Sequence, residues 1–164
     1  MSKLYLDLEE TIIRSWSDQT LCNIGKLKAF IDSNPDVDRE DVRIFSFAIY
    51  NDADKKECEK FIVPMLERAL NIKITAWPSV MEIAEIDQRH TGCRWMDADT
   101  MGGLDICEFI AIRGKPGAFE NYIWATGDDR TNYILIDDVV PSRSIIDHRR
   151  IIQVDFINVI RDLV

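Results

Sequence analysis

Acidic side chains stand at the ends of apolar runs in this sequence, where they could share a bound cation. Asp7 and Glu9 alternate at the end of the first run, and Asp137 and Asp138 close a later one. Side chains two residues apart in an extended chain point to the same face, so Asp7 and Glu9 could face one cavity. Four carboxylates in a partly dry cleft would repel one another, and hard oxygen ligands of this kind suit Mg²⁺. Together they favour a cation-binding cleft, whereas any one alone is typical of a solvated loop.

The elements that must position these acids alternate between short apolar runs and amphipathic helices. Five runs, too short for helices, predict buried strands at 3–8, 42–49, 72–77, 133–136 and 151–154. Apolar residues at helical spacing predict helices at 24–34, 58–70, 80–86, 104–112, 119–124 and 156–163. Strands joined through helices pair in parallel. We therefore expect a three-layer, Rossmann-like α/β fold with a five-stranded, mainly parallel sheet and helices on both faces.

Three segments depart from this simple alternation. Pro64 lies inside the strongest helical pattern and predicts a bend or a restart, because proline lacks a backbone donor and crowds the preceding turn. Residues 11–22 are rich in β-branched and aromatic side chains and could form a small flap hairpin. Residues 88–103 have no clear period, which predicts an irregular loop, anchored by Trp95, that could cover the cleft.

Length, charge and cysteine content exclude several classes of protein. A chain of 164 residues is expected to form one domain, 1–164. Its 29 acidic and 20 basic residues give a net charge of −9, which disfavours non-specific binding to nucleic acids and to anionic membranes. No apolar window is long enough to span a bilayer. The four cysteines form no C-x-x-C pair and nothing resembles a signal peptide, so we expect reduced thiols and a cytoplasmic location.

The order of these groups resembles the haloacid dehalogenase-like (HAD) hydrolase superfamily, whose four motifs are spread over a fold of this topology. Residues 4–11, LYLDLEET, resemble the first motif, a hydrophobic strand followed by D-x-D-x-T. Asp7 takes the nucleophile position, and Thr11 the closing threonine. Glu9 departs from the family, which has an aspartate there. The extra methylene of Glu9 would move that carboxyl by about an ångström or more. A displacement of this size can lower the rate on the order of 100-fold.

Three further segments resemble the other motifs of the family, and they follow one another in the family's order. Ser46, after Arg43-Ile44-Phe45, resembles the second motif, a hydroxyl at a strand end. Lys115, in Gly114-Lys115-Pro116, resembles the third, a lysine at the start of the helix before the fourth strand. Asp137-Asp138 resembles the fourth, an acidic pair that helps to hold Mg²⁺ beside the first aspartate.

This resemblance implies a Mg²⁺-dependent phosphatase that works through an aspartyl-phosphate. Asp7 would attack phosphorus, Glu9 would act as acid and then as base, and water would hydrolyse the intermediate. The groups that would bind the phosphate are Thr11, Ser46 and Lys115. The groups that would bind Mg²⁺ are Asp7, Glu9, Asp137 and Asp138.

The segments between the motifs hold no large cap domain. In this respect the chain resembles family members that act on large substrates. A phosphorylated substrate is therefore expected, either a small molecule or a macromolecule such as a phosphoprotein or a nucleic-acid end. A basic cluster after the fourth motif is typical of a solvated surface, and could receive a second phosphate if it lined the cleft: Arg143, His148, Arg149 and Arg150. The alternative is a HAD-like interaction protein with weak or lost catalysis, to which Glu9 and an acidic surface suited to a basic protein partner both point.

Overall fold

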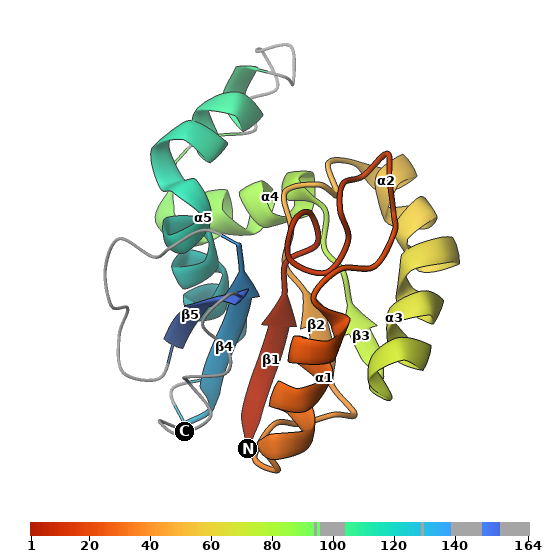
Figure 1. Cartoon of the computed structure of the whole chain (residues 1–164). Helices are drawn as coiled ribbons and strands as arrows, with labels where there is room; N and C mark the ends of the chain where they lie inside the picture. The colour runs from red at the N-terminus through yellow and green to blue at the C-terminus, as the bar shows by residue number, and fades with distance from the viewer. Residues whose placement is uncertain (94, 96–103, 129, 139–148, 155–164) are drawn as a thin grey trace.

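The apolar runs predicted as strands pair in parallel to form the middle layer of the molecule (Figure 1). The computed structural model describes residues 1–93, 95, 104–128, 130–138 and 149–154. The strand order is β3-β2-β1-β4-β5. The strands are β1 (Ser2–Leu6), β2 (Val42–Ile44), β3 (Ile74–Ala76), β4 (Asn132–Asp137) and β5 (Arg149–Gln153). The predicted three-layer, Rossmann-like fold with a five-stranded parallel sheet is confirmed.

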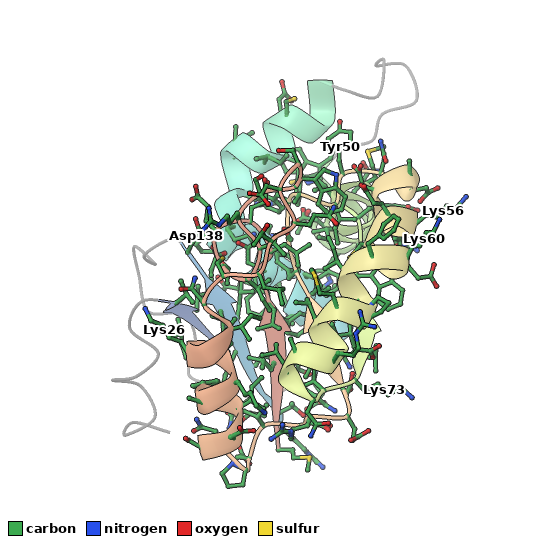
Figure 2. All side chains as sticks on the ribbon, turned by 45° about the vertical axis from the view of Figure 1, so that its right-hand side comes forward. Lys26, Tyr50, Lys56, Lys60, Lys73 and Asp138 are labelled. Atoms are coloured by element: carbon green, nitrogen blue, oxygen red, sulfur yellow. The ribbon has the colours of Figure 1, made fainter. Side chains whose placement is uncertain are left out.

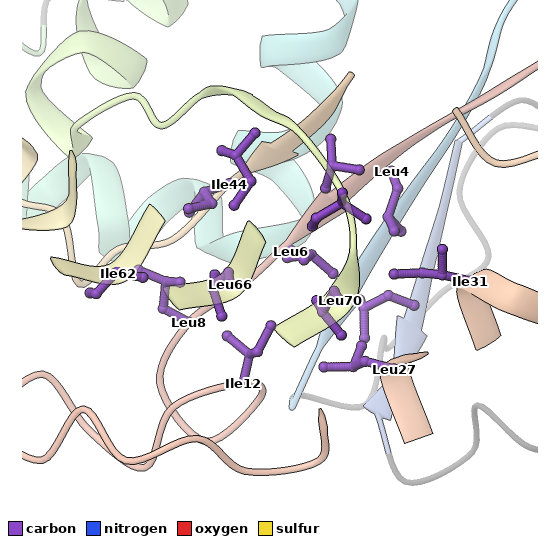
Figure 3. Packing of buried hydrophobic residues seen from close by; sticks show 14 of the residues in the cluster. Leu4, Leu6, Leu8, Ile12, Leu27, Ile31, Ile44, Ile62, Leu66 and Leu70 are labelled. Atoms are coloured by element: carbon purple, nitrogen blue, oxygen red, sulfur yellow. The ribbon is translucent and has the colours of Figure 1, made fainter. Parts of the chain in front are cut away.

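Strand β1 shows why helices must cover both faces of the sheet. Leu4 and Leu6 are fully buried in a cluster with α1 (Ile24–Ser33) and α3 (Val63–Leu70), part of which Figure 3 shows. Tyr5 points to the other face, where its ring lies 5.3 Å from that of Phe119 in α5. Successive side chains of a strand alternate between faces, so only a continuous apolar run buries both of them.

Pro64 divides the long helical segment that follows β2. The segment consists of α2 (Asp52–Glu57), a π-helical turn η1 (Cys58–Ile62) and α3, which begins one residue before the proline. Pro64 cannot donate a backbone hydrogen bond, and the wider π turn accommodates the missing bond. The bend or restart predicted at Pro64 therefore takes the form of a π-helical turn directly before α3. Lys56 and Lys60 point outward from this segment (Figure 2).

Helices α4 and α5 cover the face of the sheet opposite α1 and α3. Helix α4 (Val80–Thr91) continues beyond the predicted end, so residues 88–91 are helical and the expectation of an irregular loop there is wrong. Trp95 is buried, and the rest of the predicted loop from 96 to 103 lies outside the described residues, as does the predicted helix 156–163. None of the helices in the described part of the chain is long and apolar enough to cross a bilayer.

Helix α5 (Leu104–Thr126) consists of two helical parts that meet at Gly114. The backbone of Gly114 has φ 63° and ψ 179°, a conformation that glycine alone adopts readily. Lys115 and Pro116 begin the second part, and proline suits the first turn of a helix. The break therefore creates a helix start at the position of the predicted third motif.

Residues 11–22 form a packed loop at the carboxyl end of β1 (Figure 1). Ile13 makes a single antiparallel bridge with Leu21, so the segment follows a hairpin-like path without a ladder of strand pairs. Two side chains of this loop, Ile12 and Ile13, are fully buried. Burial of these two side chains holds the loop over the edge of the sheet where the predicted site lies.

Candidate active site

Three carboxylates meet at the carboxyl ends of β1 and β4. Leu6 pairs with Ile136, so the residues that follow them in the two strands lie side by side. One oxygen atom from each of Asp7, Asp137 and Asp138 lies within 4.8 Å of the others. Asp7 and Asp137 are buried and Asp138 is half-buried. Parallel pairing in register thus brings together acids that are 130 positions apart in the chain, at the edge where α/β folds bind ligands.

Lys115 supplies a positive charge to this group. Its Nζ lies 2.8 Å from Oδ1 of Asp7 and 3.6 Å from Oδ2 of Asp137. The side chain of Lys115 is 13% exposed, so the contacts form in a largely dry setting. The ammonium also lies 4.8 Å from the centre of the Phe47 ring, within the range of a cation–π contact.

Asp7 is repelled by the charges of both neighbouring aspartates despite Lys115. Burial raises the pKa of Asp7, the charge of Asp137 raises it further, and Lys115 offsets part of the rise. Burial also raises the pKa of Asp138. A hydrogen bond with Asp137 offsets part of that rise, whereas the charge of Asp7 and a hydrogen bond with Glu10 add to it. A divalent cation would reverse both effects, and a set of carboxylate oxygens is the donor set that Mg²⁺ and Ca²⁺ prefer. The residues present therefore fit a hard metal ion.

Thr11 contacts Asp7 from outside the cleft wall. Its hydroxyl donates to Oδ2 of Asp7 at 3.1 Å, its side chain is fully buried, and it is not among the residues that line the cleft. The turn that places it is tight, because the amides of residues 11–13 all point at the carbonyl oxygen of Leu8, at 2.9 to 3.2 Å. Glu10 has φ 61° in this turn. Thr11 is thus placed to orient the Asp7 carboxylate, and the structure does not bring this predicted phosphate-binding residue to the wall of the cleft.

Glu9 fastens the loop 11–22 to the edge of the site. Its Oε2 accepts a hydrogen bond from the backbone amide of Trp16 at 2.8 Å. The Glu9 side chain lines the cleft, but its carboxylate does not belong to the group formed by Asp7, Asp137 and Asp138. Glu9, which was predicted to bind Mg²⁺ together with the three aspartates, therefore lies beside their group and makes a contact that the sequence pattern did not indicate.

An open cleft of about 390 Å³ lies above these groups. Most of the predicted site residues contribute to its wall, namely Asp7, Glu9, Ser46, Lys115 and Asp138. Ser46 follows β2 by two residues, and its hydroxyl oxygen accepts the amide of Ala48 at 3.2 Å. That bond leaves the hydroxyl proton available to an anionic oxygen.

Other residues of the cleft wall were not predicted. Glu10, Arg14 and Phe47 line it as well, and none of them stands in a pattern that marks a site. Their positions follow from the path of the loop and from the turn after β2. The predicted basic cluster at 143–150 lies outside the side chains that the structure describes.

Asp87 of α4 forms a buried polar centre that contacts both parts of α5. The residue is 1% exposed, and its carboxylate accepts hydrogen bonds from Trp95 at 2.8 Å, Asn121 at 2.9 Å and Arg113 at 3.1 Å. Burial alone would raise the pKa of Asp87, but these hydrogen bonds lower it below its usual value. Arg113 and Asn121 come from opposite sides of Gly114, so Asp87 ties both parts of α5 to α4. The sequence feature that could have identified Asp87 is an acidic residue among the core-facing positions of α4.

Comparison with known proteins finds no relative of this chain. No family model matches the sequence, and neither the curated proteins nor the solved structures give a match.

Proposed function

We propose that this protein is a Mg²⁺-dependent phosphatase with a HAD-like mechanism, acting through an aspartyl-phosphate. The observation that carries the proposal is the buried group of Asp7, Asp137 and Asp138 with Lys115 at 2.8 Å from the first of them. A carboxylate held between a lysine and a metal site, at the floor of an open cleft, suits attack on an electrophile whose oxygens are negatively charged.

Asp7 is oriented for the first step. One oxygen contacts Lys115 and the other accepts from Thr11, which fixes the plane of the carboxylate. In this proposal an Asp7 oxygen forms a bond to phosphorus while the ester oxygen leaves and takes a proton from Glu9. Glu9 then accepts a proton from water, whose oxygen bonds to phosphorus and releases Asp7 and inorganic phosphate. Atoms and protons balance over the two steps.

The remaining groups balance charge. The Ser46 hydroxyl and the Lys115 ammonium line the cleft and can each donate to a phosphoryl oxygen. A Mg²⁺ ion held by Asp7, Asp137 and Asp138 would neutralise negative charge on the phosphoryl group and on the carboxylates. Positioning and charge stabilisation are the main requirements of phosphoryl transfer.

The test is release of phosphate from an aryl phosphate, with Mg²⁺ and with a chelator. We expect Mg²⁺-dependent turnover by the wild type, and a loss on the order of 10³-fold or more in Asp7→Asn, which removes the nucleophile. Asp36→Asn is the matched control, because this exposed acid contacts Ser2 at the other end of β1. Equal rates for the wild type and Asp7→Asn would reject the proposal.

A non-enzymatic interaction protein is the second candidate, because Glu9 is committed to holding the loop at Trp16. The variant Glu9→Asp separates the two candidates. A large gain in turnover would indicate a site that has lost its catalytic acid, whereas a loss would show that Glu9 and its loop contact serve the present reaction.

A further inference from the structure

Arg14 is a positive group of the cleft that the proposed chemistry leaves unused. It lines the cleft from the loop 11–22, whereas Lys115, also in the wall, is engaged by Asp7 and Asp137. Among the residues that the structure describes, no carboxylate lies within ion-pair distance of the Arg14 guanidinium. Asp18 comes near enough for its pKa to respond to Arg14, but its Oδ1 accepts both the hydroxyl and the amide of Thr20.

The backbone that carries Arg14 is held in place. Its amide donates to the carbonyl of Thr20 at 3.0 Å, and the side chains of Ile12 and Ile13, just before it, are fully buried. Two residues later, the amide of Trp16 is bonded to Glu9. Arg14 itself is exposed, so a fixed stretch of chain presents a hydrated guanidinium to the cleft. Preorganisation of this kind reduces the entropy lost when a ligand binds.

The size of the cleft and the chemistry of a guanidinium indicate what Arg14 would bind. A volume of about 390 Å³ lies in the range of small-molecule sites and leaves room beyond one phosphoryl group. A guanidinium forms paired, parallel hydrogen bonds with phosphate, which gives it a preference for that group. The net charge of −9 disfavours a polyanion that would extend over the surface.

We propose that Arg14 makes the cleft selective for small phosphomonoesters that carry a second phosphate group. The first phosphate would lie over Asp7, Ser46 and Lys115, and Arg14 would bind the second one at the loop. This inference rests on the proposed phosphatase function, which it deepens by naming the substrate class. A sugar bisphosphate and a nucleoside bisphosphate share the required chemistry.

The experiment compares bisphosphates with monophosphates of the same skeleton, at saturating free Mg²⁺. Fructose 1,6-bisphosphate is paired with fructose 1-phosphate and fructose 6-phosphate, and adenosine 3′,5′-bisphosphate with the two adenosine monophosphates. The variants are Arg14→Gln, Arg14→Lys and, as a matched control, Arg68→Gln, which changes the same charge at an exposed position of α3 outside the cleft.

We expect the wild type to favour at least one bisphosphate over its monophosphates by about tenfold in kcat/KM. Arg14→Gln should abolish that preference, Arg14→Lys should keep part of it because the charge remains without the fork, and Arg68→Gln should keep it whole. The skeleton that shows the preference identifies the source of the second phosphate. Lack of preference in the wild type for either skeleton, or a preference that survives in Arg14→Gln, overturns the inference.

A binding measurement separates failure of this inference from failure of the proposed function. If no substrate releases phosphate, the phosphatase proposal fails, and calorimetry with Mg²⁺ then compares inorganic pyrophosphate with inorganic phosphate. A roughly tenfold tighter affinity for pyrophosphate in the wild type that is lost in Arg14→Gln supports the second-phosphate site. Equal affinities in the wild type, or equal affinities of the wild type and Arg14→Gln for pyrophosphate, overturn it.

Discussion

The contact between Lys115 and Asp7 joins residues 108 positions apart, and both side chains are largely removed from water. A buried ion pair of this kind is costly to break on one side, because the remaining charge loses its partner and its solvent. Here the ammonium also faces Asp137, so two carboxylates depend on it. Lys115 therefore contributes to the stability of the folded chain as well as to the chemistry proposed for the cleft.

We expect Lys115→Met to lower the free energy of unfolding by about 3–5 kcal/mol in the presence of a chelator at neutral pH. Saturating Mg²⁺ should restore part of the loss, because the cation would take over the neutralisation of Asp7 and Asp137. Urea unfolding with and without Mg²⁺ measures both effects. Lys56→Met, at an exposed position of α2 (Figure 2), is the control. A comparable loss in both variants, or a loss that Mg²⁺ leaves unchanged, would contradict this account.

Elements were easier to predict than their ends. The run at 42–49 indicated one strand, but β2 ends at Ile44. The amide of Phe45 still donates to Leu6 of β1, and Phe45 and Ile49 are buried outside the strand. Apolar composition reports burial, and a packed turn buries its side chains as well as a strand does. The break in α5 is similar: the resemblance placed Lys115 at a helix start, and the backbone of Gly114 shows that another helical part ends directly before it.

Gly114→Ala should lower stability by about 1–3 kcal/mol and reduce the proposed phosphatase activity, because an alanine resists the backbone conformation that sets the start of the second helical part. Pro116 is the nearest neighbour of an added Cβ, at 3.8 Å, so the cost comes from the backbone and not from a clash. Gly117→Ala is the matched control. Its Cβ would meet Arg113 at an ordinary 3.7 Å inside a helix, and alanine there should be neutral or stabilising by up to about 1 kcal/mol. Thermal unfolding and phosphate release measure the pair, and equal behaviour of both variants would contradict the expectation.

At the scale of the whole molecule, a strongly acidic chain gathers three of its carboxylates at one edge of the sheet. The raised pKa of Asp7 and of Asp138 means that the folded, metal-free protein holds protons that the unfolded chain releases. Stability without metal should therefore fall as the pH rises through these folded-state pKa values. Divalent cations bind the deprotonated carboxylates and compete with those protons.

We accordingly expect the rise in Tm caused by Mg²⁺ to be small near about pH 4, the usual carboxylate pKa, and to grow toward neutral pH. Thermal unfolding at fixed excess Mg²⁺ and in chelator, over a series of pH values, measures the difference. Asp138→Asn should reduce the Mg²⁺ effect, and Asp36→Asn at the far edge should leave it intact. A Mg²⁺ effect that is absent, or that does not vary with pH, would count against the metal site.

Local patterns were sufficient to establish the alternation of strands and helices, the parallel sheet and the edge at which polar groups should gather, because hydrophobic periodicity encodes which face of each element is buried. They also predicted one group of acids through the rule that parallel strands end together, and the structure brings Asp7, Asp137 and Asp138 together but leaves the fourth member, Glu9, beside them. Packing decided the rest: that Thr11 contacts Asp7 from outside the cleft wall, that Glu9 holds the loop, and that Arg14 faces the cleft. These contacts depend on the path of turns and on strand register, which join distant segments and leave no periodic trace in the chain.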